Sequence, residues 1–154
     1  MNLADLLSPK QIIPELVATE RLLVITELVD CLIVSGKLPA DAREVVLAAL
    51  KQREETMSTG IGFGIAIPHA SCDAIDEVVA AFGRSKVGIE FDALDNAPVR
   101  FVVLFLVPRN QFQTHLRTLA AIAKLLNDSA MRDALERAPD AAAIHQVILD
   151  RKTA

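Results

Sequence analysis

The amino-acid sequence predicts an α/β (α+β-like) fold, a three-layer α/β/α sandwich around a small mixed β-sheet. Apolar residues follow helical spacing both before and after a group of strand-like segments, and one short strand-like segment leads the chain. The run FVVLFLV at residues 101–107 is apolar at every position. A strand that is apolar on both faces belongs in a sheet covered on both sides, so the helices should form two outer layers.

The first third of the chain contains one predicted strand and two predicted helices. The segment IIPEL at residues 12–16 is strand-like, and Pro14 indicates an edge position. Apolar residues recur at intervals of three and four over residues 19–34 before Gly36, which predicts a helix with a broad buried face. A second helix is predicted over residues 40–54, behind Pro and Asp start signals. It ends just before a cluster of glycines.

The rest of the chain contains two predicted strands followed by helices. The segments AIDEVVAAFGRS (74–85) and APVRFVVLFLVP (97–108) are rich in β-branched and aromatic residues and are bounded by turn residues, which predicts strands. Helical patterns then cover residues 111–126, 129–137 and 141–151. We therefore expect helices on both sides of the strands in sequence as well as in space.

Composition indicates a single globular domain spanning residues 1–154, because the chain has no internal repeat and no Gly/Ser-rich linker. Hydrophobic residues make up 52% of the chain and aromatic residues only 4%, so Ala, Val, Leu and Ile must build the core. The formal net charge is −4, and Lys and Arg are scattered. This pattern disfavours nucleic acid as a partner.

Nothing in the sequence indicates insertion into a membrane. The apolar run at residues 101–107 is far shorter than the roughly 20 residues that a membrane helix needs. The segment MNLADLLSPK contains an acidic residue and no basic region before a long apolar stretch, unlike a secretory signal. Two cysteines, Cys31 and Cys72, cannot form a disulfide framework. We expect a cytoplasmic protein.

The stretch STGIGFGIAIPHA, residues 58–70, places Gly60, Gly62 and Gly64 at alternate positions. Glycine allows a backbone to approach a ligand closely. The spacing is neither the G-x-G-x-x-G that opens a helix in dinucleotide-binding proteins nor a P-loop. The alternative is a plain glycine-rich turn between a helix and a strand. The charged and hydroxyl side chains on either side favour a functional site.

The three histidines differ in their surroundings. His145 lies in the predicted last helix among ordinary neighbours, where a solvated or partly packed ring is expected. His115 lies near the start of a predicted helix, where the helix dipole favours anions and disfavours protonation of an imidazole. His69 follows Pro68 at the end of the glycine-rich segment, which should present one ring nitrogen to a surface cleft. A neutral imidazole is a competent nucleophile, so covalent catalysis by His69 is possible.

The same residue types also occur in zinc sites and in hydrolytic triads. A zinc site built on His69 and Cys72 would need a second well-spaced Cys/His pair, which the sequence lacks. A hydrolytic triad with Ser58 as nucleophile lacks the G-x-S-x-G elbow. We expect neither.

Three segments resemble a known family. REETMSTGIGFGIAIPHA (53–70) resembles the active-site signature of enzyme IIA of the fructose and mannitol class in the bacterial phosphoenolpyruvate-dependent sugar phosphotransferase system (PTS), including its nitrogen-regulatory branch. GRSKVGIEFDALDNAPV (83–99) resembles the segment that follows the active site. FLVPRNQFQTHLRTLAAIAKLL (105–126) resembles the family's strand and the helix that carries a second histidine. The resemblance covers essentially the whole chain.

The resemblance implies that His69 is phosphorylated by the phosphocarrier HPr, or by a nitrogen-branch paralogue of HPr, and passes the phosphoryl group on. His115 matches the second active-site histidine and Arg53 matches the active-site arginine. In phosphoryl transfer the protein mainly positions the group and stabilises charge on its three oxygens, which fits these residue types. A turn of backbone N–H groups could cradle those oxygens; its predicted members are Ser58, Thr59, Gly60, Gly62 and Gly64. Neither a metal nor a cofactor is expected.

Two functions remain open. The sequence has no attached IIB, IIC or HPr domain, which favours a stand-alone regulator whose phosphorylation state a partner protein reads. The alternative is a sugar-specific IIA that passes phosphate to a IIB domain. The sequence departs from the family at Phe63, where a small or polar residue is commoner, and lacks the Gly-Lys that commonly follows the active-site histidine. Phe63 could serve as an exposed anchor for the carrier or could pack onto the core.

Overall fold

The structure is a computed structural model that describes residues 3–151. Its six strands are, in chain order, β1 (Ile12–Ile13), β2 (Gly60–Gly62), β3 (Ile65–Ala66), β4 (His69–Cys72), β5 (Val79–Ile89) and β6 (Val99–Pro108). They form one sheet in the order β1-β5-β6-β3-β2, with β4 also paired to β6. β6 is antiparallel to β5 and parallel to β3 and β4, so the sheet is mixed, as predicted.

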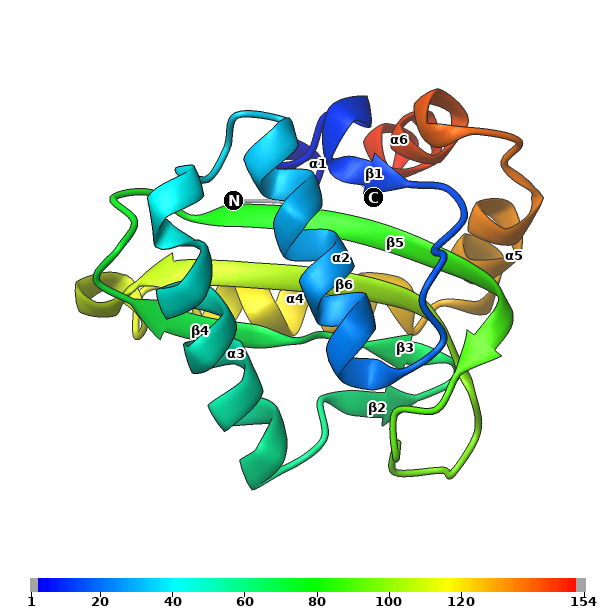
Figure 1. The fold of residues 1–154 in the computed structure, drawn as a ribbon. Helices are drawn as coiled ribbons and strands as arrows, with labels where there is room; N and C mark the ends of the chain where they lie inside the picture. Colours follow the sequence, from blue (N-terminus) through cyan, green and yellow to red (C-terminus); the bar gives the residue numbers. More distant parts are fainter. Residues whose placement is uncertain (1–2, 152–154) are drawn as a thin grey trace.

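Helices connect and cover the strands. They are α1 (Leu3–Leu6), α2 (Arg21–Val34), α3 (Arg43–Thr56), α4 (Leu116–Leu126), α5 (Ser129–Arg137) and α6 (Ala141–Asp150), with short 3-10 turns η1 (Pro9–Gln11), η2 (Ala40–Ala42) and η3 (Arg109–Gln111). α2 and α3 pack on one face of the sheet, where they cross in front of the strands in Figure 1. The other face is covered by α1, α4, α5 and α6. The described helices contain none that is long and apolar enough to span a bilayer.

Strand β6 takes part in both hydrophobic cores. Val102, Leu104 and Leu106 pack toward α2 and α3, whereas Val103 and Phe105 pack toward the other helical layer. Residues 101–107 are all buried. The three-layer α/β/α sandwich is therefore confirmed, and the apolar run is the central strand that the sequence predicted.

Most element boundaries match the sequence prediction within a few residues, and α5 matches it at both ends. The strand predicted over residues 12–16 is limited to β1, because Pro14 has no N–H to continue the ladder. The helix predicted from residue 111 begins only at Leu116. Before it, the chain forms η3 and a turn in which the His115 N–H faces the carbonyls of Gln111 and Phe112, each at 3.2 Å. The predicted domain runs from 1 to 154; its first two and last three residues lie outside the described part.

Strands β3 and β4 are one strand interrupted at Ile67 and Pro68. Ile65 lies opposite Phe101 and His69 lies opposite Phe105, so the register on β6 is the same on both sides of the interruption. Pro68 has no N–H, but its carbonyl accepts a hydrogen bond from the Phe105 N–H at 2.9 Å. His69 is thus held at the first position of β4.

A two-residue turn joins β2 to β3. Its central residues, Phe63 and Gly64, have φ angles of 57° and 77°. Positive φ at both positions is typical of a type I′ hairpin turn. At the other end of β2, Gly60 packs against the loop between β5 and β6, where an added Cβ would lie 2.8 Å from the Cβ of Ala93. Only glycine fits at this contact without a shift of the loop.

We expect Gly60→Ala to lower the free energy of unfolding by about 1–3 kcal/mol, the usual cost of overpacking. Urea denaturation measures this change. Ala93→Gly should recover part of the loss in the double variant, because it removes the nearer of the two atoms that the new methyl group would strike. An unchanged unfolding midpoint for Gly60→Ala would show that the loop moves freely.

Candidate functional site

His69 has a defined ring orientation. It is half-buried, and its Nδ1 lies 2.7 Å from the carbonyl oxygen of Ile67. A carbonyl oxygen only accepts hydrogen bonds, so Nδ1 carries the hydrogen. In the neutral ring, Nε2 then holds the unshared electron pair. Nε2 is therefore the nucleophilic nitrogen of His69.

Burial lowers the pKa of His69 below its ordinary value of 6.5. The positive charge of Arg53 lowers the pKa further, whereas the hydrogen bond to Ile67 and the negative charge of Glu54 raise it. The net direction is downward. The ring is consequently neutral at pH 7, the state in which Nε2 can attack an electrophile.

His115 lies at the residue directly before α4, close to the helix start, as expected. Its ring stands edge-on to the ring of Phe105, with centroids 6.3 Å apart and an interplanar angle of 76°. Its Nδ1 lies 3.4 Å from the hydroxyl oxygen of Thr118 in the first turn of α4. Phe105 is also the residue opposite His69 in the sheet, so both histidines adjoin the same side chain.

The structure brings the two histidines together around a small cavity. Its volume is about 10 Å³, room for about one water molecule. The wall is mostly apolar and consists of His69, Ala70, Phe105, Val107, Phe112, His115, Leu116 and Leu119. The cavity is therefore too small to enclose a group larger than about one water molecule.

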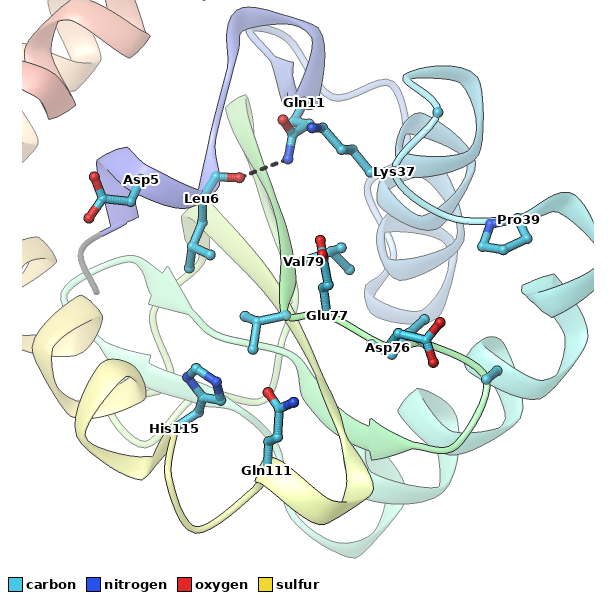
Figure 2. A pocket seen from close by; sticks show the side chains of 14 residues that line it. Asp5, Leu6, Gln11, Lys37, Pro39, Asp76, Glu77, Val79, Gln111 and His115 are labelled. Atoms are coloured by element: carbon cyan, nitrogen blue, oxygen red, sulfur yellow. Dashed lines mark hydrogen bonds between the residues drawn. The ribbon is translucent and has the colours of Figure 1, made fainter.

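His115 also faces a much wider polar cleft of about 820 Å³, shown in Figure 2. His115 and Gln111 form one wall, and Lys37 and Gln11 lie on the opposite side. The loop between β4 and β5, with Asp76, lies between them. His69 does not line this cleft. His115 thus separates the small apolar cavity beside His69 from an open, charged surface.

Arg53 lies in the last turn of α3. Its Nη1 donates a hydrogen bond of 2.8 Å to the carbonyl oxygen of Met57, directly after the helix. The side chain is half-buried, and its charge is close enough to act on the pKa of His69. The structure therefore places Arg53 near His69, with one guanidinium nitrogen bonded to the helix end.

The first part of the glycine stretch is tied to neighbouring segments. The Ser58 hydroxyl donates to the carbonyl of Phe91 and accepts the Gly60 N–H at 3.1 Å. The N–H and hydroxyl of Thr59 bond to the carboxylate of Glu54. The Thr59 carbonyl accepts the Ile67 N–H at 3.1 Å. Ser58, Thr59 and Gly60 thus support the strand that leads to His69.

Gly62 and Gly64 lie elsewhere, at the tip of the β2–β3 hairpin. Ile65, next to this tip, pairs with Phe101, whereas His69 pairs with Phe105, four residues further along β6. Four residues of a strand span about 13 Å. The carbonyl of Gly64 accepts hydrogen bonds from the N–H groups of Arg100 and Phe101. The structure does not bring Gly62 and Gly64 to His69; they shape the turn.

Comparison with known proteins identifies the family. Residues 5–151 match the family model described as "Phosphoenolpyruvate-dependent sugar phosphotransferase system, EIIA 2". The chain belongs to this family. Its members, here called EIIA proteins, are phosphoryl carriers that work through a phosphohistidine.

Both branches of the EIIA family are among the relatives. The chain is 37% identical over 123 residues to the PTS system fructose-specific EIIA component of Haloferax volcanii, covering 80% of this chain and 79% of that protein. It is 32% identical over 148 residues to a nitrogen regulatory protein of Bradyrhizobium diazoefficiens, covering 96% and 95%.

Solved structures share the fold. The nitrogen regulatory protein IIA-Ntr of Neisseria meningitidis superposes with a TM-score of 0.85 at 26% identity, covering 95% of this chain and 98% of that one. The mannitol IIA of Escherichia coli gives a TM-score of 0.76 at 18% identity, covering 92% and 98%. The second likeness shows the common fold alone.

Glu54 was not singled out from the sequence, although the pattern held a signal for it. Val46, Leu47 and Leu50 form the buried face of α3, and Glu54 continues the same spacing of three and four residues. It is only 2% exposed. A carboxylate on the apolar face of a helix must find hydrogen-bond donors inside the protein, and Glu54 finds them on Thr59.

Phe63 does not pack onto the core. Its side chain is 63% exposed, and the guanidinium of Arg132 in α5 lies 5.1 Å from the ring centroid. The Phe63 N–H bonds to the carboxylate of Asp95 at 3.0 Å. Phe63 is therefore a surface residue of the hairpin tip, remote from the two histidines.

We expect an NMR titration of His69 to give a midpoint below 6.5, because burial disfavours the charged ring. Arg53→Gln removes a positive charge that disfavours protonation and should raise this midpoint. Lys51→Gln, on the same helix, is the matched control and should leave it unchanged. A parental midpoint at or above 6.5, or no response to Arg53→Gln, would contradict the electrostatics described here.

The same shift predicts how stability depends on pH. The folded state binds fewer protons at His69 than the unfolded state does wherever the pH lies between the two pKa values. Above pH 6.5 the ring is neutral in both states and His69 does not favour unfolding. As the pH falls below 6.5, the unfolded state binds the proton first, so the free energy of unfolding decreases.

Proposed function

We propose that this EIIA protein accepts a phosphoryl group on Nε2 of His69, from HPr or from a nitrogen-branch paralogue of HPr. The observation that carries the proposal is the hydrogen bond from Nδ1 to the Ile67 carbonyl, which leaves Nε2 as the nucleophile. In the transfer, the phosphorus–nitrogen bond of the donor phosphohistidine breaks and a bond from phosphorus to Nε2 forms. Nδ1 keeps its hydrogen throughout, so no separate base is required.

Arg53 and His115 would stabilise the phosphoryl group in transit. Its negative charge is spread over three oxygens, and positioned donors at these oxygens lower the barrier. Arg53 can supply planar N–H donors from the end of α3. His115 lies at the start of α4, beside the cavity that His69 also lines, where the helix dipole favours an anion. Because the cavity that both histidines line is so small, the group would lie outside it.

The glycine stretch is not a backbone cradle for the phosphoryl group in this proposal. Since Ser58, Thr59 and Gly60 are engaged with Phe91, Glu54 and each other, we assign them a supporting role. Gly62 and Gly64 are left out of the site. The positive groups for the phosphoryl oxygens are then Arg53 and the helix end at His115.

For the acceptor, we favour a regulatory role in which a partner protein reads the phosphorylation state of His69. The structural likeness to IIA-Ntr, with both higher identity and a higher TM-score than to the mannitol IIA, supports this choice. The second candidate is transfer to a IIB domain for sugar uptake, supported by the fructose-specific relative and by the solved complex of mannitol IIA with phosphorylated IIB. The cytoplasmic location stays a prediction.

Transfer from the phosphorylated protein to purified fructose-type and mannitol-type IIB domains separates the two candidates. A regulator should pass phosphate to neither at an appreciable rate. Rapid transfer to either domain would overturn the regulatory assignment and establish the second candidate.

We expect incubation with phosphoenolpyruvate, enzyme I and HPr, or the nitrogen-branch counterparts of these carriers, to place one acid-labile phosphate on His69. His69→Ala should fold and remain unlabelled. His145→Ala is the control: His145 lies on the outer helix α6 and its ring bonds to the carbonyl of Leu7, so its loss should leave labelling intact. Labelling of His69→Ala at the parental level would refute the assignment.

We expect His115→Ala to acquire label on His69 at long times but about 30- to 1000-fold more slowly, because a donor acting in the transition state contributes about 2–4 kcal/mol. Quench-flow transfer from the phosphorylated donor gives the rate, and peptide mapping gives the labelled residue. His115→Gln retains a donor and should recover part of the rate. A parental rate for His115→Ala would make His115 a structural residue, and label on His115 would reverse the two roles.

A further inference from the structure

Glu54 is a buried carboxylate beside the proposed phosphoryl acceptor. Its Oε1 accepts the Thr59 N–H at 3.0 Å, and the Thr59 hydroxyl lies 3.1 Å from Oε1 and 2.8 Å from Oε2. Burying a carboxylate costs free energy unless hydrogen bonds replace its water. These bonds all go to a single residue, so Glu54 holds Thr59 by both its backbone and its side chain.

No ion pair accounts for the burial of Glu54. Among the ion pairs of residues 3–151, none includes its carboxylate. The neighbouring Arg53 uses Nη1 to bond the carbonyl of Met57. Within the described residues, Thr59 is therefore the hydrogen-bonding partner of the Glu54 carboxylate.

Further hydrogen bonds connect Thr59 to the ring of His69. The Thr59 carbonyl accepts the Ile67 N–H at 3.1 Å, and the Ile67 carbonyl accepts Nδ1–H of His69 at 2.7 Å. Ile67 and Pro68 form the interruption between β3 and β4, where regular pairing to β6 is lost. The Pro68 carbonyl still accepts the Phe105 N–H of β6, and the Ile67 N–H is bonded to Thr59, the residue directly before β2. Thr59 thus helps to fix the backbone at Ile67.

We propose that Glu54 is a positioning residue for phosphoryl transfer, which acts through Thr59 and the Ile67 backbone to hold His69 with Nδ1 protonated and Nε2 directed to the incoming group. This inference rests on the proposed function of His69. The bonds that change are those of the proposed transfer: phosphorus leaves the donor nitrogen and joins Nε2, while the hydrogen on Nδ1 stays in its bond to Ile67. Among the described residues, the side chain of Glu54 bonds to Thr59 and the ring of His69 bonds to Ile67, so the effect of Glu54 on the ring is indirect.

The decisive variants are Glu54→Leu and Glu54→Gln. Leucine fills a similar volume but accepts no hydrogen bond, so it releases Thr59. Glutamine keeps one acceptor oxygen for the Thr59 N–H and can donate to its hydroxyl, so it preserves the connection without the charge. Glu55→Leu changes the adjacent exposed carboxylate of the same helix and is the matched control.

Two measurements are made on each folded variant. The nitrogen-15 chemical shifts of the His69 ring, recorded above its pKa, report which nitrogen carries the hydrogen. Quench-flow transfer from the phosphorylated donor, at several donor concentrations, separates the maximal rate from donor binding. We expect Glu54→Leu to mix the two tautomers and to slow the maximal rate about 10- to 100-fold, with donor binding unchanged. Glu54→Gln and Glu55→Leu should keep the parental tautomer and stay within about threefold of the parental rate.

The outcomes decide the inference. A folded Glu54→Leu with parental tautomer and rate overturns it, even if its unfolding temperature is lower, because Glu54 would then only stabilise the fold. Equal losses of transfer rate in Glu54→Gln and Glu54→Leu also overturn it. The negative charge of Glu54 would then matter, and its hydrogen bonds to Thr59 would not. If Glu54→Leu does not fold, Thr59→Val and Thr59→Ser take its place: valine lacks the hydroxyl and should show the loss, whereas serine should show none.

The tautomer measurement needs no phosphoryl donor. If His69 of the parent protein takes no label, the proposed function fails, whereas the ring orientation can still depend on Glu54. If the parent protein labels normally and only the Glu54 variants behave unexpectedly, the positioning role alone fails.

Discussion

The pairing of β6 along both of its edges determines the position of the candidate site. Because both faces of β6 are buried, a slip of one residue would exchange the side chains of the two cores, for example Leu104 and Phe105. That register places His69 opposite Phe105, against which His115 also packs. Pro68 interrupts the neighbouring strand next to the histidine. The regular pairing of β6 thus fixes the place of the irregular segment at residues 67–68, and the Ile67 carbonyl in this segment orients the ring of His69.

The end of α3 serves both the fold and the site through two adjacent residues. Successive side chains on a helix point about 100° apart, so Glu54 turns into the core while Arg53 remains half-buried. Their charges act on the pKa of His69 in opposite directions, and both contribute less than the burial of the ring does. His69 is therefore kept neutral mainly by desolvation. Arg53 adds to this effect, and in the proposed mechanism its guanidinium also serves phosphoryl binding.

The EIIA fold by itself does not decide which partner receives the phosphoryl group. Regulatory and sugar-specific relatives share this family, and the mannitol IIA retains the fold at 18% identity. Partner choice must depend on surfaces around the site. The polar cleft that His115 lines is one such surface.

The sequence alone determined the long helices, the central strand and the candidate histidine, because each has a signal within its own stretch of chain. Helical periodicity located α2, α3, α5 and α6, and the apolar run located β6, because each of these elements is long enough to repeat its own spacing. His69 was a candidate from the sequence because the proline and glycines beside it are local signals. Strands β2 to β4 have two to four residues each and are too short to show a period.

Tertiary structure decided which of the predicted residues meet. No signal in the sequence separates the five residues of the predicted phosphate cradle from one another. The sheet register places Gly62 and Gly64 away from His69 and leaves Thr59 close to it. The late start of α4 sets His115 against Phe105, and the burial of Glu54 ties α3 to Thr59. Each of these contacts joins different secondary-structure elements. Their geometry follows from the packing and pairing of those elements, which no local pattern specifies.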